Sequence, residues 1–402
     1  MIRLKLLSDL DVKNRIVLLR VDLNLPRKDG KVKDNTRITR VVATINYLIF
    51  QNAKIVIISH IGRPKGKLDP ELSLEPIIVE LEKCLDRKVK FCRECVGPVA
   101  KNAINNMQFG DIILLENLRF HPGEELNDIN FINQLANLGN VYINDTFSCS
   151  HRKHASIYGI AEKLPSAAGF LLWNELSSIT SFLNDNNKPF TVIIGGAKIS
   201  TKLSLLNKLV ERVDYLIIAG AMANTFLAAK GLNIGCSLYE PSLTEAALHI
   251  LQKSLTTNCQ IILPFDVVTI SNFNQIKGKK KPQLVPVQEV RLSDKIMDIG
   301  SKTLNYIAKI IERSRVLAWN GPVGVFEQIP FDYGSNYLAK LIAQETSKQR
   351  LCSVIGGGDT ISAIRPTGLI NSFSYVSTGG GAFLAWLENK TLPGIEVLRD
   401  EK

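Results

Sequence analysis

The stretch LCSVIGGGDTISAI, residues 351–364, begins as a short apolar run, passes through three glycines and continues into a segment compatible with a helix. A buried strand that turns through glycines into a helix directs bare backbone N–H groups and the positive end of the helix dipole at one point, which suits phosphate. Asp359 adds a hard oxygen ligand of the kind that Mg²⁺ prefers beside phosphates. Nucleotide phosphate is therefore the expected ligand, although the loop alone fits an ordinary capped helix start equally well.

The composition of the chain narrows its class. Its 402 residues are 45% hydrophobic, which predicts roughly two to three globular domains. Apolar runs such as residues 55–58 are far too short for a membrane span, and the amino terminus does not resemble a secretion signal. The seven cysteines are scattered, and Cys92 and Cys95 have no second pair with which to hold zinc. We expect a cytoplasmic protein with reduced thiols.

The formal net charge of +11 invites a nucleic-acid-binding interpretation. The basic residues are spread along the chain, however, and the one dense cluster, within residues 277–281, contains no aromatic residue. Positive charge of this kind also attracts small, highly anionic substrates. We therefore expect small-molecule substrates and neither a nucleic-acid nor a membrane partner.

Four predicted strands in the first half of the chain end in polar or basic residues. They cover residues 15–21, 54–59, 111–115 and 141–144. Ligands bind at the carboxyl ends of strands in open parallel sheets, so side chains that follow these strands are expected to converge. An amphipathic helix over residues 36–50 places Arg37 in its first turn, where a nearby anion would compensate the unfavourable helix dipole. The arginines that would form a polyanion site are Arg37, Arg63, Arg119 and Arg152.

The second half of the chain repeats this alternation after a polar break at residues 184–189. A helix over residues 200–211 would place Lys198 and Lys202 four residues apart at its start, where a phosphate would compensate both charges. The pattern predicts an α/β fold with two doubly wound parallel-sheet domains. Besides the strand in 351–364, the predicted strands, most of them followed by glycines, cover residues 191–194, 215–219, 261–263, 315–319 and 375–377.

Several nucleotide-binding and catalytic motifs are absent. The chain contains no Gly-x-x-x-x-Gly-Lys-[Ser/Thr] sequence, which marks a P-loop. The motifs of protein kinases and the Gly-x-Ser-x-Gly motif of serine hydrolases are also missing. Gly195 and Gly196 do not form a dinucleotide fingerprint, which disfavours a nicotinamide-dependent dehydrogenase. A dehydrogenase and a nucleic-acid-binding protein are the alternatives to a phosphotransferase.

Nine short motifs together resemble those of the phosphoglycerate kinase family and follow the family's order. They are RVDLNLP (20–26), TRI (36–38), SHIGRP (59–64), ENLRF (116–120), HRKHAS (151–156), GGAKIS (195–200), WNGPVGVFE (319–327), GGGDT (356–360) and STGGGA (377–382). The resemblance implies reversible phosphoryl transfer between 1,3-bisphosphoglycerate and Mg-ADP, giving 3-phosphoglycerate and ATP. The domains would be Rossmann-like and joined by a helix and hinge, and we expect a monomer.

The resemblance also divides the chain. Residues 1–184 would bind the glycerate substrate, residues 185–390 would bind the nucleotide, and the tail, residues 391–402, would pack back on the first domain. Three sites depart from the family's usual pattern. Ser148-Cys149-Ser150 stands where Gly-Thr-Ala is more frequent, Lys153 replaces a small residue, and Ala385 occupies the usual place of a glutamate in the last helix. We expect these departures to affect local packing and hinge behaviour rather than the chemistry.

The resemblance assigns roles to individual residues of this sequence. The substrate-binding residues would be Asp22, Asn24, Arg37, His60, Arg63, Arg119 and Arg152. The nucleotide-binding residues would be Gly196, Ala197, Lys198, Lys202, Gly220, Asn320, Gly321, Glu327, Gly357, Gly358, Asp359 and Thr360, with Asp359 on the metal side and Glu327 at the ribose. The catalytic residues, which would face the phosphoryl group in transfer, are Arg37, Lys198, Lys202, Gly379 and Gly380.

The chemistry of this reaction suits these residue types. In the direction that consumes ATP the nucleophile is a carboxylate, whose pKa of about 3 to 4 leaves it ionised at pH 7, so no general base is needed. The reaction requires neutralised charge and in-line alignment, which cations, Mg²⁺ and backbone amides supply. His60 is therefore expected to bind substrate rather than to carry a proton.

Overall fold

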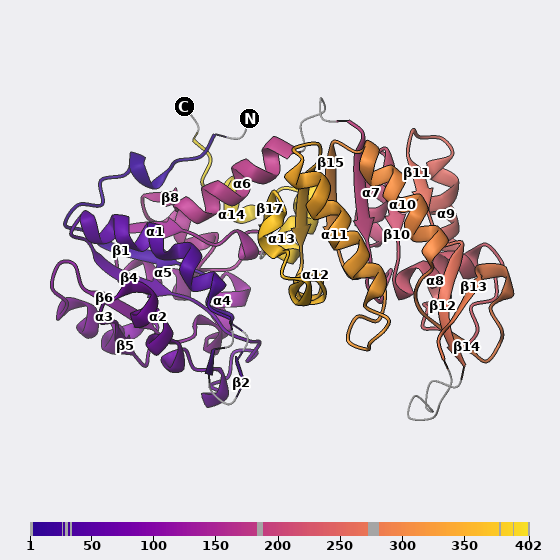
Figure 1. Cartoon of the computed structure of the whole chain (residues 1–402). Coiled ribbons are helices and arrows are strands. Elements are labelled where there is room, and N and C mark those ends of the chain that lie inside the picture. Colours follow the sequence, from indigo (N-terminus) through magenta and orange to yellow (C-terminus); the bar gives the residue numbers. More distant parts are fainter. Residues whose placement is uncertain are drawn as a thin grey trace. The chain divides into compact units, whose positions relative to one another are not determined.

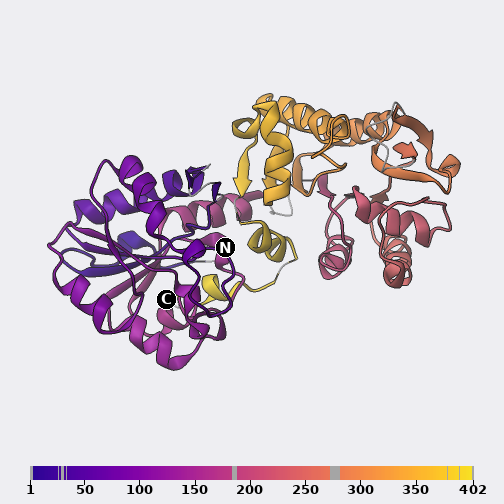
Figure 2. The ribbon, with the colours of Figure 1, turned by 90° about the horizontal axis from the view of Figure 1, so that it is seen from below.

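The computed structural model of the chain describes residues 3–25, 27–28, 31–32, 34–182, 188–271, 281–377, 379–388 and 390–400. The chain forms two compact units, whose elements are drawn in Figure 1 and, from below, in Figure 2. Unit 1 comprises residues 1–177 and 391–402, and unit 2 comprises residues 178–390. Most of the predicted break at 184–189, most of the basic cluster at 277–281, and Pro26 and Thr378 of the quoted motifs lie outside the described residues.

Unit 1 is built on a six-stranded parallel sheet with the strand order β5-β6-β4-β1-β7-β8. Its strands are almost wholly apolar because helices cover both faces of the sheet. Val17 and Leu19 of β1 join one hydrophobic core, and Leu18 between them joins the other. The strands are β1 (Ile16–Arg20), β4 (Lys54–Ile58), β5 (Lys90–Cys92), β6 (Ile112–Leu115), β7 (Val141–Asn144) and β8 (Ser166–Ala168).

Helices complete the two cores of unit 1. The face that carries Val17 is covered by α1 (Thr36–Phe50), α2 (Ile78–Leu85) and the start of α6 (Phe170–Phe182). The opposite face is covered by α3 (Gly97–Asn105) and α5 (Ile129–Ala136). The predicted helix over residues 36–50 is confirmed at both ends by α1, whose apolar side chains face the core.

The end of the chain lies against its beginning. The amide of Lys5 donates to the carbonyl of Leu398 at 3.1 Å, and the amide of Asp400 donates to the carbonyl of Arg3 at 3.0 Å. In the sequence, the short helix α14 (Pro393–Glu396) follows the last residues of unit 2 and precedes the residues that make these contacts. Residues 391–400 therefore belong to the hydrogen-bonded structure of unit 1.

Unit 2 contains a second six-stranded parallel sheet with the order β11-β10-β9-β15-β16-β17. One of its faces packs against α10 (Ser301–Arg313) and α11 (Tyr333–Ser347). The strands are β9 (Phe190–Ile194), β10 (Tyr215–Ile218), β11 (Gln260–Ile262), β15 (Val316–Asn320), β16 (Cys352–Gly356) and β17 (Tyr375–Ser377). The other helices are α7 (Leu203–Leu209), α8 (Ala221–Ala229), α9 (Thr244–Ser254), α12 (Gly358–Ile364) and α13 (Gly380–Leu387). The predicted α/β class with two parallel sheets is confirmed.

A small antiparallel sheet in unit 2 was not predicted. Its order is β13-β12-β14, and its strands are β12 (Asp266–Ser271), β13 (Gln283–Pro286) and β14 (Asp294–Ile299). The edge strand β13 is exposed at Gln283 and Leu284 and half-buried at its other two residues, so it lacks the buried apolar run by which the other strands were predicted. None of the helices that the structure describes is long and apolar enough to cross a membrane.

The helix predicted at residues 200–211 corresponds to α7, which begins later than expected, at Leu203. Lys202 precedes α7 with a non-helical backbone, so the prediction that Lys198 and Lys202 share one helical turn is wrong. The amide and the hydroxyl of Ser200 donate to the carboxylate of Glu240 at 3.0 and 2.6 Å. This tertiary contact satisfies the donors of Ser200 outside a helix.

Candidate active site

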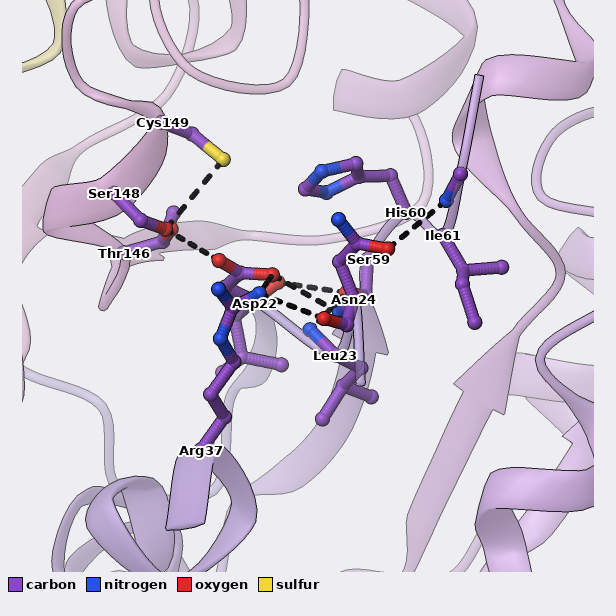
Figure 3. Close-up of polar contacts among 12 residues, drawn as sticks. Asp22, Leu23, Asn24, Arg37, Ser59, His60, Ile61, Thr146, Ser148 and Cys149 are labelled. Carbon is purple, nitrogen blue, oxygen red and sulfur yellow. Dashed lines mark hydrogen bonds and ion pairs between the residues drawn. The ribbon is translucent and has the colours of Figure 1, made fainter. Parts of the chain in front are cut away.

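The first group of predicted site residues follows neighbouring strands of the unit 1 sheet. β6, β4, β1 and β7 are adjacent and parallel, so the segments after them leave the sheet at one edge. Figure 3 shows side chains at this edge, with Asp22 at the centre of their polar contacts. The prediction that these strands end side by side is confirmed.

Asp22 accepts hydrogen bonds at both carboxylate oxygens. Oδ1 accepts from Nη1 of Arg37 at 2.9 Å and from the amide of Asn24 at 3.0 Å, and Oδ2 accepts from the hydroxyl of Ser148 (Figure 3). Burial by itself raises the pKa of Asp22, but the Arg37 guanidinium and these hydrogen bonds outweigh burial and hold the pKa below its usual value. Asp22 is therefore ionised at neutral pH.

Arg37 lies in the first turn of α1, where its charge opposes the helix dipole. The anion that compensates this charge is the carboxylate of Asp22, and the same Nη1 atom also donates to the carbonyl of Asn24 at 2.8 Å. Among the described residues, nothing engages Nε or Nη2 of Arg37, and 27% of the side chain is exposed. The position of Arg37 is thus explained without a ligand, while two of its nitrogens remain available to one.

His60 is buried and is held by Arg20, a residue that the sequence-based assignment omitted. Nη2 of Arg20 lies 3.0 Å from Nδ1 of His60. Burial, reinforced by the Arg20 charge, lowers the pKa of His60 well below its usual value, so the ring is neutral at pH 7. The signal that could have indicated Arg20 is a charged residue within the apolar run of residues 16–21.

The other predicted arginines of unit 1 differ in burial. Arg119 is buried, and its Nη1 donates to the carbonyl of Gly62 at 2.7 Å. Arg152 is half-buried, and its Nε donates to Nε2 of His151 at 3.2 Å. Arg63 is exposed, and its side chain forms no hydrogen bond or ion pair with the described residues. The structure therefore holds Arg119 and Arg152 in place and leaves Arg63 free to rearrange.

The second group of predicted site residues lies where strands of the unit 2 sheet end. Gly195 follows β9 and packs against the segment after β15, since a Cβ on Gly195 would lie 2.1 Å from the carbonyl oxygen of Pro322. Gly321 has a φ of +94°, and a Cβ there would lie 2.3 Å from the carbonyl oxygen of Gly195. These glycines allow two strand ends to cross in contact. The amide of Gly196 donates to the carbonyl of Pro322 at this crossing and that of Gly321 donates to the hydroxyl of Thr360, so neither is free for a ligand.

Replacing Gly195 by alanine is expected to destabilise unit 2 by about 3 kcal/mol, because the new methyl group would overlap backbone atoms. Gly358→Ala is the matched control, since nothing lies within 4 Å of a Cβ at Gly358. Urea unfolding followed by circular dichroism measures both variants. Equal stability of the two variants would contradict the close crossing at Gly195.

Lys202 is firmly held in unit 2. Its Nζ donates to the carbonyl of Gly195 at 2.8 Å and to Oδ1 of Asn320 at 2.7 Å. Burial lowers the pKa of Lys202 to about 8, and the charge of Asp359 opposes that shift. A bound phosphate would stabilise the charged form of this buried amine. Lys198, in contrast, is exposed.

Two adjoining pockets open beside Lys202. The more polar one, about 350 Å³, includes Lys198, Lys202 and residues 357–360 in its lining. The other, about 240 Å³, is lined largely by apolar side chains and also by Glu327. Gly196, Ala197 and Asp359 line both pockets. Every residue that the resemblance assigns to the nucleotide lines one or both of them, namely Gly196, Ala197, Lys198, Lys202, Gly220, Asn320, Gly321, Glu327, Gly357, Gly358, Asp359 and Thr360.

The starts of α12 and α13 approach each other at glycines. A Cβ on Gly380 would lie 2.9 Å from Cα of Gly357, whose φ is +98°. Gly379 is buried, and its amide donates to the hydroxyl of Ser377 at 3.2 Å. The structure thus brings Gly380 beside the Gly357 loop, which lines the polar pocket.

Comparison with known proteins places this chain in a family. The family model described as phosphoglycerate kinase matches residues 7–390. The chain belongs to the phosphoglycerate kinase family. It is 59% identical over 398 residues to the phosphoglycerate kinase of Orientia tsutsugamushi (strain Ikeda), covering 99% of this chain and 98% of that protein.

Solved structures of phosphoglycerate kinases share the fold. The structure of the phosphoglycerate kinase from Coxiella burnetii matches with a TM-score of 0.85 and 37% identity, covering 98% of each chain. That of the phosphoglycerate kinase from Pyrococcus horikoshii OT3 matches with a TM-score of 0.84 and 30% identity, covering 99% of this chain and 98% of the other.

One departure from the usual phosphoglycerate kinase pattern lies in the site itself. Ser148 stands where glycine is more frequent, and its hydroxyl donates to Asp22 and lies 3.2 Å from Oγ1 of Thr146. This departure therefore contacts a residue that the resemblance assigns to the substrate. Of the other departures, Lys153 places its Nζ 4.3 Å from the ring centre of Tyr158, and Ala385 is half-buried in α13.

The buried histidines of this phosphoglycerate kinase family member predict a pH-dependent stability. Burial lowers the pKa of His154 to about 3, whereas an unfolded histidine titrates near 6.5. The unfolded chain therefore binds the extra proton between these values, so stability is fully present above pH 6.5 and is lost as the pH falls below it. Asp145 and Asp298, whose pKa values burial raises to about 6 and about 7, act in the opposite direction.

Comparison of variants isolates the contribution of His154 to the pH dependence of stability. Lowering the pH from about 7.5 to about 5 is expected to destabilise the parent chain more than His154→Gln, because glutamine takes up no proton. His249 is exposed in unit 2, so His249→Gln is the control and should keep the parental pH dependence. Urea unfolding at the two pH values checks this. An unchanged pH dependence in His154→Gln would show that His154 is not held neutral.

Proposed function

We infer that this chain is a phosphoglycerate kinase, which transfers a phosphoryl group reversibly between 1,3-bisphosphoglycerate and ADP and forms 3-phosphoglycerate and ATP. The observation that carries this inference is the family match over residues 7–390. The two groups of site residues suit it, since one unit presents arginines for an anionic substrate and the other presents adjoining polar and apolar pockets for a nucleotide.

Turnover with ADP and 1,3-bisphosphoglycerate tests the proposed activity. ATP formation should depend on both substrates and on Mg²⁺. Nicotinamide reduction and salt-dependent RNA binding, measured on the same preparation, distinguish the dehydrogenase and nucleic-acid-binding alternatives. A folded preparation that forms no ATP would overturn the proposal.

The proposed roles follow the two units. In unit 1 we assign the glycerate substrate to Asp22, Asn24, Arg37, His60, Arg63, Arg119 and Arg152. In unit 2 we assign the nucleotide to the twelve residues that the resemblance indicates, all of which line one or both pockets, with Glu327 at the ribose. The moving phosphoryl group would be stabilised by Arg37, Lys198, Lys202 and the Gly380 backbone; the amide of Gly379, which the resemblance also assigns, already donates to Ser377 and would have to exchange that bond. The presence of Lys202 in the polar pocket, with a pKa of about 8, supports its assignment.

The proposed mechanism is in-line transfer stabilised by charge, without a general base. The acceptor carboxylate of 3-phosphoglycerate is already ionised at neutral pH. His60 is neutral and buried beside Arg20, so it is suited to donate a hydrogen bond rather than to remove a proton. Arginine and lysine side chains would balance the charge that develops on the transferred group.

Mg²⁺ is the metal that the family implies, and Asp359 fits it. The Asp359 carboxylate is exposed between the two pockets and has no hydrogen bond or ion pair with other described residues. Among the described residues no group of three or more His, Cys, Asp or Glu side chains is suited to a metal. The ion would thus be held by Asp359 and by phosphate oxygens, as is usual for Mg²⁺, and would neutralise phosphate charge.

We further propose that the chain is a cytoplasmic monomer whose domains close on their substrates, with the predicted break at residues 184–189 lying a few residues after the boundary between units 1 and 2. Limited proteolysis of the free protein should cut near this break, and both substrates together should protect it. Each substrate alone is the control. Cleavage that the substrate pair does not slow would count against closure, and size-exclusion chromatography with light scattering tests the monomer.

A further inference from the structure

A series of buried polar contacts leads to His60 in unit 1. The carboxylate of Glu124 accepts the hydroxyl of Ser156 at Oε1, 2.6 Å away, and the amide of Ser156 at Oε2, 2.9 Å away. The Ser156 hydroxyl oxygen accepts in turn from Nε of Arg20 at 2.9 Å. Nη2 of Arg20 lies 3.0 Å from Nδ1 of His60. The contacts therefore link Glu124 in α4 (Pro122–Leu126) to a residue that the resemblance assigns to the substrate.

Within this series of contacts, Arg20 and Glu124 carry opposite charges, and both are removed from water. Arg20 is 1% exposed, and Glu124 and Ser156 are 0% exposed. An unpaired buried charge is costly, so Arg20 and Glu124 stabilise each other through the bridging hydroxyl. Nη1 of Arg20 also donates to the carbonyl of Val21, and Tyr142 Oη donates to the carbonyl of Ser156 at 2.6 Å. The Arg20 guanidinium is thereby fixed in orientation.

This geometry determines which nitrogen of His60 carries the proton. A guanidinium has hydrogen-bond donors and no acceptor, so Nδ1 of His60 must accept from Arg20 and must be unprotonated. A neutral imidazole with an unprotonated Nδ1 carries its proton on Nε2. Among the described residues, Nε2 of His60 has no hydrogen-bond partner. It is therefore an unused donor at the edge of the sheet where the arginines gather.

We propose that Glu124 and Ser156 are positioning residues, which act through Arg20 to hold His60 neutral as the Nε2–H tautomer. The proposal extends the proposed function, because an N–H donor suits the anionic glycerate substrate whereas the other tautomer would present a lone pair to it. The charged groups that face His60 are Arg20, Asp22, Arg37 and Arg119. The three arginines disfavour a second proton on the ring, and Asp22 alone favours it.

Nitrogen NMR of the substrate-free protein tests the tautomer directly. The chain has five histidines, so ¹⁵N-histidine labelling gives a sparse long-range ¹H–¹⁵N spectrum in which His60→Gln identifies the His60 signals. We expect the Nε2–H pattern between about pH 5 and about pH 8, without titration. A protonated ring or an Nδ1–H pattern at neutral pH would overturn the proposal outright.

Removing the bridge should release His60. In Ser156→Ala, Arg20 loses its Nε partner, so we expect the guanidinium to lose its fixed orientation and His60 to exchange between tautomers. Glu124→Gln should also increase tautomer exchange of His60. If Ser156→Ala does not fold, Glu124→Gln is compared with the control in its place. Ser166→Ala is the matched control, because its buried hydroxyl donates to the carbonyls of Ala161 and Leu164 and has no contact with Arg20. A His60 signal as fixed in both variants as in the control would contradict the proposal.

Kinetics separate positioning from general structural damage. Loss of one oriented hydrogen bond to the substrate should raise KM for 3-phosphoglycerate about three- to tenfold in Ser156→Ala, with kcat and the KM for ATP retained. A fall in kcat with unchanged KM would argue against a binding role for the fixed ring. Because the NMR measurement needs no substrate, absence of turnover in the parent chain would count against the proposed function and not against the tautomer.

Discussion

Replacing Arg37 by alanine is expected to lower kcat by about a hundred- to a thousandfold, by analogy with the loss of one donor that stabilises transition-state charge. Arg37 reaches the site from the first turn of α1, and Nη1 is held by Asp22 at 2.9 Å. Nε and Nη2 are not engaged by the described residues, so they can serve charge that develops during transfer. An interaction made mainly in the transition state lowers kcat, whereas loss of uniform binding raises KM alone.

Steady-state kinetics with 3-phosphoglycerate and ATP distinguish these cases. Arg37→Lys should recover part of the activity, because an ammonium group restores charge but cannot bridge two oxygens as a guanidinium does. Arg15→Ala is the control: it also removes an ion pair, with Asp11, but before β1, at the end of the strand away from the site. If Arg37→Ala keeps kcat and merely needs more 3-phosphoglycerate, Arg37 is a binding residue only, and Lys198 and Lys202 carry the charge.

Replacing Asp359 by alanine should weaken Mg-ADP binding by about ten- to a hundredfold, the usual range for losing one contact to a charged group. The Asp359 carboxylate lies where the polar and apolar pockets meet and is not engaged by other described residues. Its loss therefore leaves no buried partner unsatisfied, and the effect should fall on the metal-nucleotide rather than on folding. Binding of 3-phosphoglycerate to unit 1 should be unchanged.

Isothermal titration calorimetry measures this with Mg-ADP and with ADP in the presence of a chelator. The deficit should appear with Mg-ADP and nearly vanish without metal, since Asp359 would act through Mg²⁺. Glu312→Ala is the matched control, because Glu312 is an exposed acid at the end of α10 and lines neither pocket. Unchanged Mg-ADP affinity in Asp359→Ala would remove Asp359 from the metal site.

The local sequence determined the elements whose signals are local. Apolar runs marked the buried strands β1, β4 and β7, because a strand covered on both faces must be apolar along its whole length. The 3.6-residue period of α1 marked both of its ends. Polar residues and glycines directly after strands indicated one edge of each sheet, and Asp22 and the glycines beside Lys202 lie there in the structure.

Tertiary structure decided what depends on partners far away in the chain. α7 begins at Leu203 rather than Ser200, and the donors of Ser200 bond instead to Glu240, forty residues on. Arg20 was missed since its role rests on Ser156, 136 residues away, and through it on Glu124. No local pattern can reveal such pairs, because the cost of burying each charge is offset only when folding brings its partner into contact.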